Sequence, residues 1–167
     1  LKDVGLEPIV AATAISVIGL FNMLGTWLSG WLADRYRKKY LLGSLYLMRS
    51  VIFLVFIMVP VTPVSVYIFA ACIGLLWLAT VPLTSGIVFG MFGPRYMATL
   101  YGIVFFSHQV GSFTSVWLGG IIRDINGSYD LAWWIIIVVG ALASFLHWPI
   151  DERPVAEVVA DRKGAAA

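Results

Sequence analysis

Charged residues are scarce in this sequence. Only 12% of its 167 residues are Asp, Glu, Lys or Arg, whereas 60% are hydrophobic. A soluble domain carries about 25% charged residues, so this composition excludes an ordinary soluble globular protein. The net charge of +2 is small and concentrated in short segments. It provides no broad basic surface, and we expect no nucleic-acid partner.

Cysteine and histidine are also nearly absent. The single cysteine, Cys72, lies in an apolar stretch and excludes both an internal disulfide and a cysteine-rich metal site. The sequence contains no HExxH or GxSxG motif and no paired carboxylates, and its two histidines, His108 and His147, are far apart. We therefore expect no metal, no cofactor and no catalytic residues, which argues against a membrane enzyme.

The chain does contain long runs without charge. These runs cover residues 8–33, 50–94, 96–122 and 131–150. A helix of about 20 apolar residues crosses a bilayer, and lipid cannot satisfy an open strand edge. We therefore predict an all-α integral membrane fold. The predicted spans are about 8–33, 40–59, 65–92, 97–122 and 130–149, with an extracytoplasmic loop at 1–7 and a cytoplasmic tail at 150–167.

The basic residues predict how these spans are oriented. Arg35, Arg37, Lys38 and Lys39 fall within five consecutive positions. Lys and Arg accumulate in cytoplasmic loops, so this block is expected inside. Alternation of the spans then leaves only Lys2 and Arg123 outside, and it predicts a cytoplasmic C-terminus in the cell membrane.

The same block resembles a known signature. Its loop is similar to the pattern Gly-x-x-x-Asp-Arg-x-Gly-Arg-Arg/Lys of the major facilitator superfamily, although Arg37 replaces the second glycine. The matching residues are Gly30, Asp34, Arg35, Lys38 and Lys39. The stretch SHQVGSFTSVWLGGIIRDINGSYDLAWW and the ending PIDERP resemble the bacterial monocarboxylate and oxalate–formate transporter-like branch.

This resemblance implies a fold and a function. The five spans would be helices eight to twelve of a twelve-helix transporter, a partial C-terminal six-helix bundle that lacks the N-terminal half as a partner. Such a protein moves a small, here anionic, organic solute across the bilayer by alternating access. The alternative is a non-transporting five-span scaffold or assembly subunit, which would be complete as it stands.

The resemblance also implies a role for Asp34. In the superfamily, the aspartate of this signature caps the start of a helix across the cytoplasmic face and holds that face closed, and a helix N-terminus does favour a carboxylate. Arg35 and the lysines would neutralise Asp34 and bind anionic headgroups. The alternative is a solvated loop that only sets topology.

Arg49 is the one charged residue in the interior of a predicted span, since Asp130 stands at the very start of span 130–149. Counted from Tyr40, it lies about 14 Å along its helix at about 1.5 Å per residue, near the middle of the bilayer. A central arginine is unfavourable there and needs a partner. The partner can be backbone carbonyls, a group in the missing half or an anionic substrate. Arg49 therefore either contacts substrate or forms a structural or gating pair.

Uncharged polar residues give further candidates. Asn22 and Thr26, one turn apart, can bind a polar substrate or pack against a neighbouring helix. His108, Gln109 and Ser112 lie together on span 97–122. His108 can bind a carboxylate or relay a proton, because imidazole titrates near physiological pH, or it can bond to a neighbouring helix.

Small residues and one proline complete the predictions. Ser107, Gly111, Ser115 and Gly119 form a ladder that allows close helix packing. Pro82 removes a backbone hydrogen bond within span 65–92, and nearby hydroxyls can satisfy the freed carbonyl. The resulting kink is either a hinge or a static bend.

Overall fold

The computed structural model describes residues 5–164. Lys2, the first four residues of the predicted N-terminal loop, the tail residues 165–167 and the side chain of Arg162 lie outside the described residues. Within the described residues the secondary structure is helical, without strands. The helices are α1 (Pro8–Ala33), α2 (Lys38–Met58), α3 (Pro63–Trp77), α4 (Thr80–Phe92), α5 (Pro94–Asn126), α6 (Asp130–His147) and α7 (Val155–Gly164).

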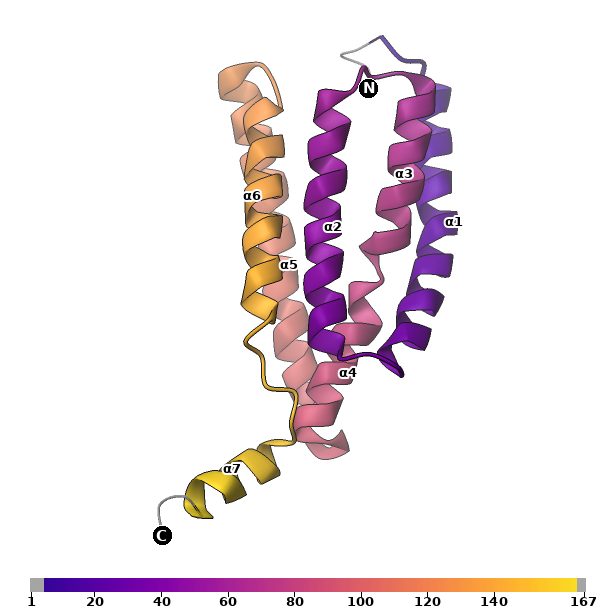
Figure 1. Cartoon of the computed structure of the whole chain (residues 1–167). Coiled ribbons are helices and arrows are strands. Elements are labelled where there is room, and N and C mark those ends of the chain that lie inside the picture. Colours follow the sequence, from indigo (N-terminus) through magenta and orange to yellow (C-terminus); the bar gives the residue numbers. More distant parts are fainter. Residues whose placement is uncertain (1–4, 165–167) are drawn as a thin grey trace.

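α1, α2, the stretch formed by α3 and α4, α5 and α6 run alternately down and up, and α3 and α4 share one direction (Figure 1). The turn between α1 and α2 lies at the same end of the bundle as α7, and the turn between α2 and α3 lies at the opposite end. This alternation agrees with the order of the predicted spans. The all-α membrane fold is confirmed.

Local sequence explains where the helices begin and end. At the start of α3, the Thr62 hydroxyl accepts a hydrogen bond from the Ser65 backbone and the Ser65 hydroxyl accepts one from the Thr62 backbone, a capping box. Gly93, between α4 and α5, has φ +72° and ψ 178°, and Gly127, after α5, is left-handed. Only glycine adopts such backbone angles readily.

The third predicted span is not one continuous helix. α3 ends at Trp77, and α4 begins at Thr80. Pro82 has no N–H to donate to the carbonyl of Leu78 four residues earlier, and that carbonyl instead accepts a hydrogen bond from the Val81 N–H at 3.0 Å. The stretch Pro63–Phe92 thus remains one candidate span, built from two helical segments with an interruption at residues 78–79, where Pro82 predicts a kink.

Two close helix pairs form the core. A Cβ at Gly25 of α1 would lie 1.8 Å from the carbonyl oxygen of Leu75 in α3, and one at Gly74 would lie 2.7 Å from the carbonyl oxygen of Ile18. Glycine lets these two backbones approach each other closely. α2 packs along α6 in a similar way, because a Cβ at Gly140 would lie 2.4 Å from the Ser50 hydroxyl.

Four segments are long and apolar enough to cross a membrane among the described residues: α1, α2, the combined stretch Pro63–Phe92, and α6. α5 has 33 residues but is not one of them. His108, Gln109 and several serines lower its hydropathy. Its assignment as a fifth span therefore remains a prediction.

The tail departs from expectation. The sequence ADRKGAAA suggests disorder, yet residues 160–164 belong to α7. Arg153 donates hydrogen bonds both to Asp151 and to Asp161, at 2.9 Å each. The bond to Asp161 joins α7 to the segment that follows α6, and the bond to Asp151 holds Arg153 within that segment.

Candidate functional site

The interruption of the third span brings together residues from three helices. α3 has 15 residues and α4 has 13, so the interruption at residues 78–79 falls near the middle of the span. The last carbonyls of α3 have no partners within the helix. Arg49 of α2 donates hydrogen bonds from its Nη2 to the carbonyls of Leu76 and Trp77.

α1 supplies the second contact. The Oδ1 atom of Asn22 accepts a hydrogen bond from the backbone N–H of Leu78 at 3.1 Å. Arg49 thus satisfies carbonyls on one side of the interruption, and Asn22 satisfies an N–H within it. Arg49 and Asn22, which the sequence predicts as separate candidates, thus bond to adjacent residues of one turn.

Aromatic rings surround the Arg49 guanidinium. The ring centroid of Tyr46 lies 5.4 Å from its central carbon and that of Trp77 lies 5.8 Å away, both within cation–π range. The Nε atom of Arg49 is buried and has no hydrogen-bond partner among residues 5–164. Of the three partners predicted for Arg49, which are backbone carbonyls, a group in the N-terminal half and an anionic substrate, the described residues provide the backbone carbonyls.

Hydroxyl groups support the start of α4. Thr80 donates to the carbonyl of Trp77 at 3.4 Å, and Thr84 donates to the carbonyl of Thr80 at 2.8 Å. Neither hydroxyl reaches the carbonyl of Leu78, which the missing N–H of Pro82 would have satisfied. The site therefore combines one cation, one amide and several hydroxyls around a helix interruption whose two residues, Leu78 and Ala79, keep right-handed helical angles.

The signature loop lies at the end of the bundle near α7. The Asp34 side chain is exposed and makes no hydrogen bond or ion pair with any described residue. Arg35 bonds instead to the carbonyl of Trp31 at 3.0 Å and stacks on its ring. Gly30 has open space where a Cβ would stand. No ion pair joins Asp34 to the neighbouring basic residues within 5–164, and its neutralisation by them stays a prediction.

A hollow of about 360 Å³ adjoins this loop. It is bounded by the turn between α1 and α2, by α4 and by the segment after α6. The Lys38 side chain lies against α4, because a Cβ at Gly86 would come within 2.8 Å of its Cε atom. The other lining residues include Asp34, Arg35, Arg37, Gly90 and Glu152.

The remaining candidates do not join the site around Arg49. Thr26 donates to the carbonyl of Asn22 at 2.8 Å, within its own helix. His108, Gln109 and Ser112 lie in the stretch 102–118 of α5, which is exposed throughout. A Cβ added at Gly111 or Gly119 would meet no atom within 4 Å, so no close helix contact is present at the predicted ladder among the described residues.

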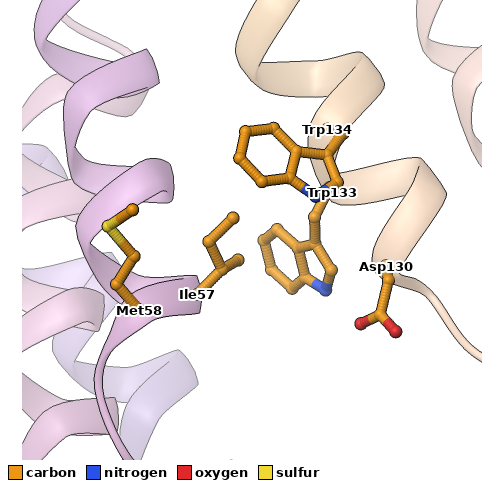
Figure 2. Close-up of a pocket in the computed structure, with 5 residues that line it drawn as sticks. All are labelled: Ile57, Met58, Asp130, Trp133 and Trp134. Atoms are coloured by element: carbon orange, nitrogen blue, oxygen red, sulfur yellow. The ribbon is translucent and has the colours of Figure 1, made fainter.

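A second hollow, of about 190 Å³, lies between the end of α2 and the start of α6 (Figure 2). Trp133 projects between Ile57 and Asp130, with Trp134 beside it. Trp133 also packs against Phe53, with ring centroids 5.6 Å apart, whereas Trp134 is 49% exposed. Aromatic side chains at this level are typical of a membrane interface, and the hollow is separate from the helix interruption.

These features define a class of protein. A helical membrane bundle with a discontinuous span, braced near its middle by polar side chains from neighbouring helices, is typical of secondary transporters. The sequence profile described as Major Facilitator Superfamily matches residues 1–167. The chain therefore belongs to this superfamily, and it is a multi-pass membrane protein of the transporter class.

Individual relatives agree with this assignment. An uncharacterized MFS-type transporter, YcxA, of Bacillus subtilis is 28% identical over 144 residues, which are 80% of this chain and 34% of the relative. Monocarboxylate transporter 12-B of Danio rerio is 26% identical over 80% of this chain and 28% of its own length. Monocarboxylate transporter 13 of Rattus norvegicus is 25% identical over 84% of this chain and 32% of its own length. The chain thus spans about a third of the length of the curated relatives it matches.

Proposed function

We propose that the protein is a secondary transporter that moves a small organic anion, of the monocarboxylate class, across the cell membrane by alternating access. The observation that carries the proposal is the interrupted span held by Arg49 and Asn22. The interruption breaks the regular helix hydrogen bonds while Leu78 and Ala79 keep right-handed helical angles. Helix breaks near the middle of a membrane are tolerated where they are buried in protein or line a cavity, and the discontinuous helices of transporters bind solutes at such points.

The anionic substrate is supported by the charges of the spans. No acidic residue lies within 8–33, 40–59, 65–92, 97–122 or 131–149, whereas Arg49 lies beside the interruption. The N-terminal end of α4, which carries a partial positive charge, begins at the same point. Two of the relatives named above are monocarboxylate transporters. Asn22 and Thr26 on α1 and His108, Gln109 and Ser112 on α5 complete the residues proposed for solute or proton contact.

The arrangement of the chain in the membrane belongs to the same proposal. Residues 8–149 form five spans, with α3 and α4 sharing one, and correspond to helices eight to twelve of a twelve-helix protein. Residues 1–7 are extracytoplasmic, and residues 150–167 form a cytoplasmic tail. Asp34, exposed beside the basic loop, is available to cap a helix of the N-terminal half and close the cytoplasmic face.

Uptake into proteoliposomes tests this function. The protein at its full length is expected to accumulate labelled lactate, pyruvate or acetate saturably, and unlabelled monocarboxylates are expected to compete. Labelled glucose and choline are the neutral and cationic controls. Uptake of only the neutral or cationic solute would contradict the anionic class. Absence of uptake for every solute of a wider panel would favour a membrane scaffold instead.

A further inference from the structure

The N-terminus of α2 lacks a cap of its own. Its N-cap residue, Arg37, makes no side-chain capping bond, and no acidic residue lies in the first turn. Helix N-terminal N–H groups need acceptors, and a carboxylate is the most favourable one. The local sequence RYRKK supplies only cations at this point.

The missing acceptor comes from the other end of the chain. The Oε1 atom of Glu152 accepts a hydrogen bond from the backbone N–H of Lys39 at 2.7 Å, across 113 residues of sequence. In the opposite direction, the Nζ atom of Lys39 donates to the carbonyl of Ile150, also at 2.7 Å. One residue of the signature loop is therefore bound twice by the segment that follows α6.

Packing between α2 and α6 holds the segment that follows α6 close to the start of α2. A Cβ at Gly43 would lie 2.8 Å from Nε1 of Trp148, so the indole rests directly on the α2 backbone. One turn further along, the rings of Tyr46 and His147 stack with centroids 5.0 Å apart. These contacts bring Ile150 and Glu152 to the start of α2 and leave little freedom for them to move elsewhere.

We infer that Glu152 is a positioning residue of the transporter: it caps α2 from the C-terminal segment and thereby fixes the basic loop at 34–39. Glu152 lines the same hollow as Asp34, Arg37 and Lys38. The cap fixes the point where α2 begins, and the loop that carries Asp34 is only a few residues long. The role of this loop in the transport cycle rests on the proposed function, whereas the cap itself does not.

Hydrogen exchange of the backbone amides tests the cap without any transport assay. In the protein at its full length, Glu152→Ala is expected to speed exchange in the peptide 38–42 by about 5–30-fold, as expected for loss of an N-cap. Glu152→Gln keeps an acceptor oxygen at the same reach and is expected to retain most of the protection. Glu157→Ala removes an exposed glutamate from α7 and is the matched control, with no change expected.

Equal exchange at 38–42 in Glu152→Ala and Glu157→Ala would overturn the inference. If Glu152→Ala fails to fold, Lys39→Met provides the second variant, because it removes the bond to Ile150 and keeps the backbone N–H. It is expected to increase exchange in the peptide 149–153. Unchanged exchange there would also overturn the inference.

Uptake gives the readout that distinguishes positioning from general stability. Glu152→Ala is expected to lower the maximal uptake rate at an unchanged half-saturating concentration, and Glu152→Gln is expected to restore most of that rate. Equal losses in both variants, or a changed half-saturation alone, would contradict positioning. No uptake by the unaltered protein would contradict the proposed function only, since the exchange result stands without it.

Discussion

Arg49 of α2 donates a hydrogen bond to the carbonyl of Leu76, the last residue but one of α3. A cation at this position has two favourable effects. It satisfies carbonyls that the end of a helix leaves without partners, and it interacts favourably with the negative end of the α3 dipole. A charged side chain and a break in a helix are each unfavourable when exposed to lipid. Here Arg49 stabilises the interruption of the third span by binding its free carbonyls.

Arg49→Ala tests this brace directly. Removal of the guanidinium leaves the carbonyls of Leu76 and Trp77 without that donor, and a hydrogen bond from a charged group contributes about 1.5–3 kcal/mol. We expect thermal stability to fall and amide exchange in 76–81 to rise. Arg95→Ala, which removes an exposed arginine at the start of α5, is the control. Equal stability of the two variants would show that the brace contributes nothing.

The contact between Asn22 and Leu78 makes a separate prediction about coupling. Asn22→Ala and Arg49→Ala alter the same turn, so their effects on the free energy of unfolding should not add. Neighbouring residues that share a network couple by about 0.5–3 kcal/mol. The pair Asn22→Ala and Arg95→Ala is expected to be additive within about 0.5 kcal/mol. Additivity of the first pair in a double-mutant cycle would mean that the two side chains act independently.

The glycines between α1 and α3 predict a difference between two substitutions in one helix. Gly25→Ala places a methyl group 1.8 Å from the Leu75 carbonyl oxygen, and backbone cannot move aside without opening the interface. We expect a loss of about 1–3 kcal/mol. Gly19→Ala, where no atom lies within 4 Å, is the matched control and should not destabilise. A comparison of melting temperatures decides the point, and equal values would contradict the close α1–α3 contact.

Acid is expected to weaken the contact between α7 and the segment after α6. Asp151 holds Arg153 in place, and Arg153 donates in turn to Asp161 of α7. Hydrogen bonds from Arg153 lower the pKa of the Asp151 carboxyl below its ordinary value. Its stabilising effect is therefore complete above the ordinary Asp pKa of about 3.9, and it is lost as the pH falls through the lowered value. Spin labels at positions 44 and 159, introduced after Cys72→Ser, should report one distance at every pH above the ordinary Asp pKa and a broadened distribution only once the pH falls through the lowered pKa of Asp151. Asp151→Asn should give the broadened distribution at every pH, and an unbroadened one would contradict this link.

The sequence was sufficient for the helical membrane fold, because long charge-free runs are a property of the chain itself. It also identified Arg49 and Asn22 as unusual. It could not identify their partners, because backbone carbonyls and N–H groups carry no sequence signal. Pro82 indicated a disturbance of the third span, but Arg49 and Asn22, from other helices, stabilise the interruption at 78–79.

Small residues were harder to interpret. The ladder on α5 has the spacing of a close helix contact, yet the glycines that meet a neighbour within 3 Å of an added Cβ lie in other helices: Gly25, Gly43, Gly74, Gly86 and Gly140. Glycine is frequent in many spans of this chain, and only the three-dimensional pairing of helices decides which glycines meet a neighbour. The cap of α2 by Glu152 was missed for a related reason, since its two residues lie 113 positions apart.

The initial rate of labelled monocarboxylate uptake by Arg49→Ala, beside Arg95→Ala and the unaltered protein in the same proteoliposomes, tests the central claim most directly. The account predicts uptake by the unaltered protein and by Arg95→Ala, and a rate lower by about tenfold or more in Arg49→Ala, equivalent to about 1.4 kcal/mol or more. Equal rates in all three proteins would show that the braced interruption of the third span has no part in transport.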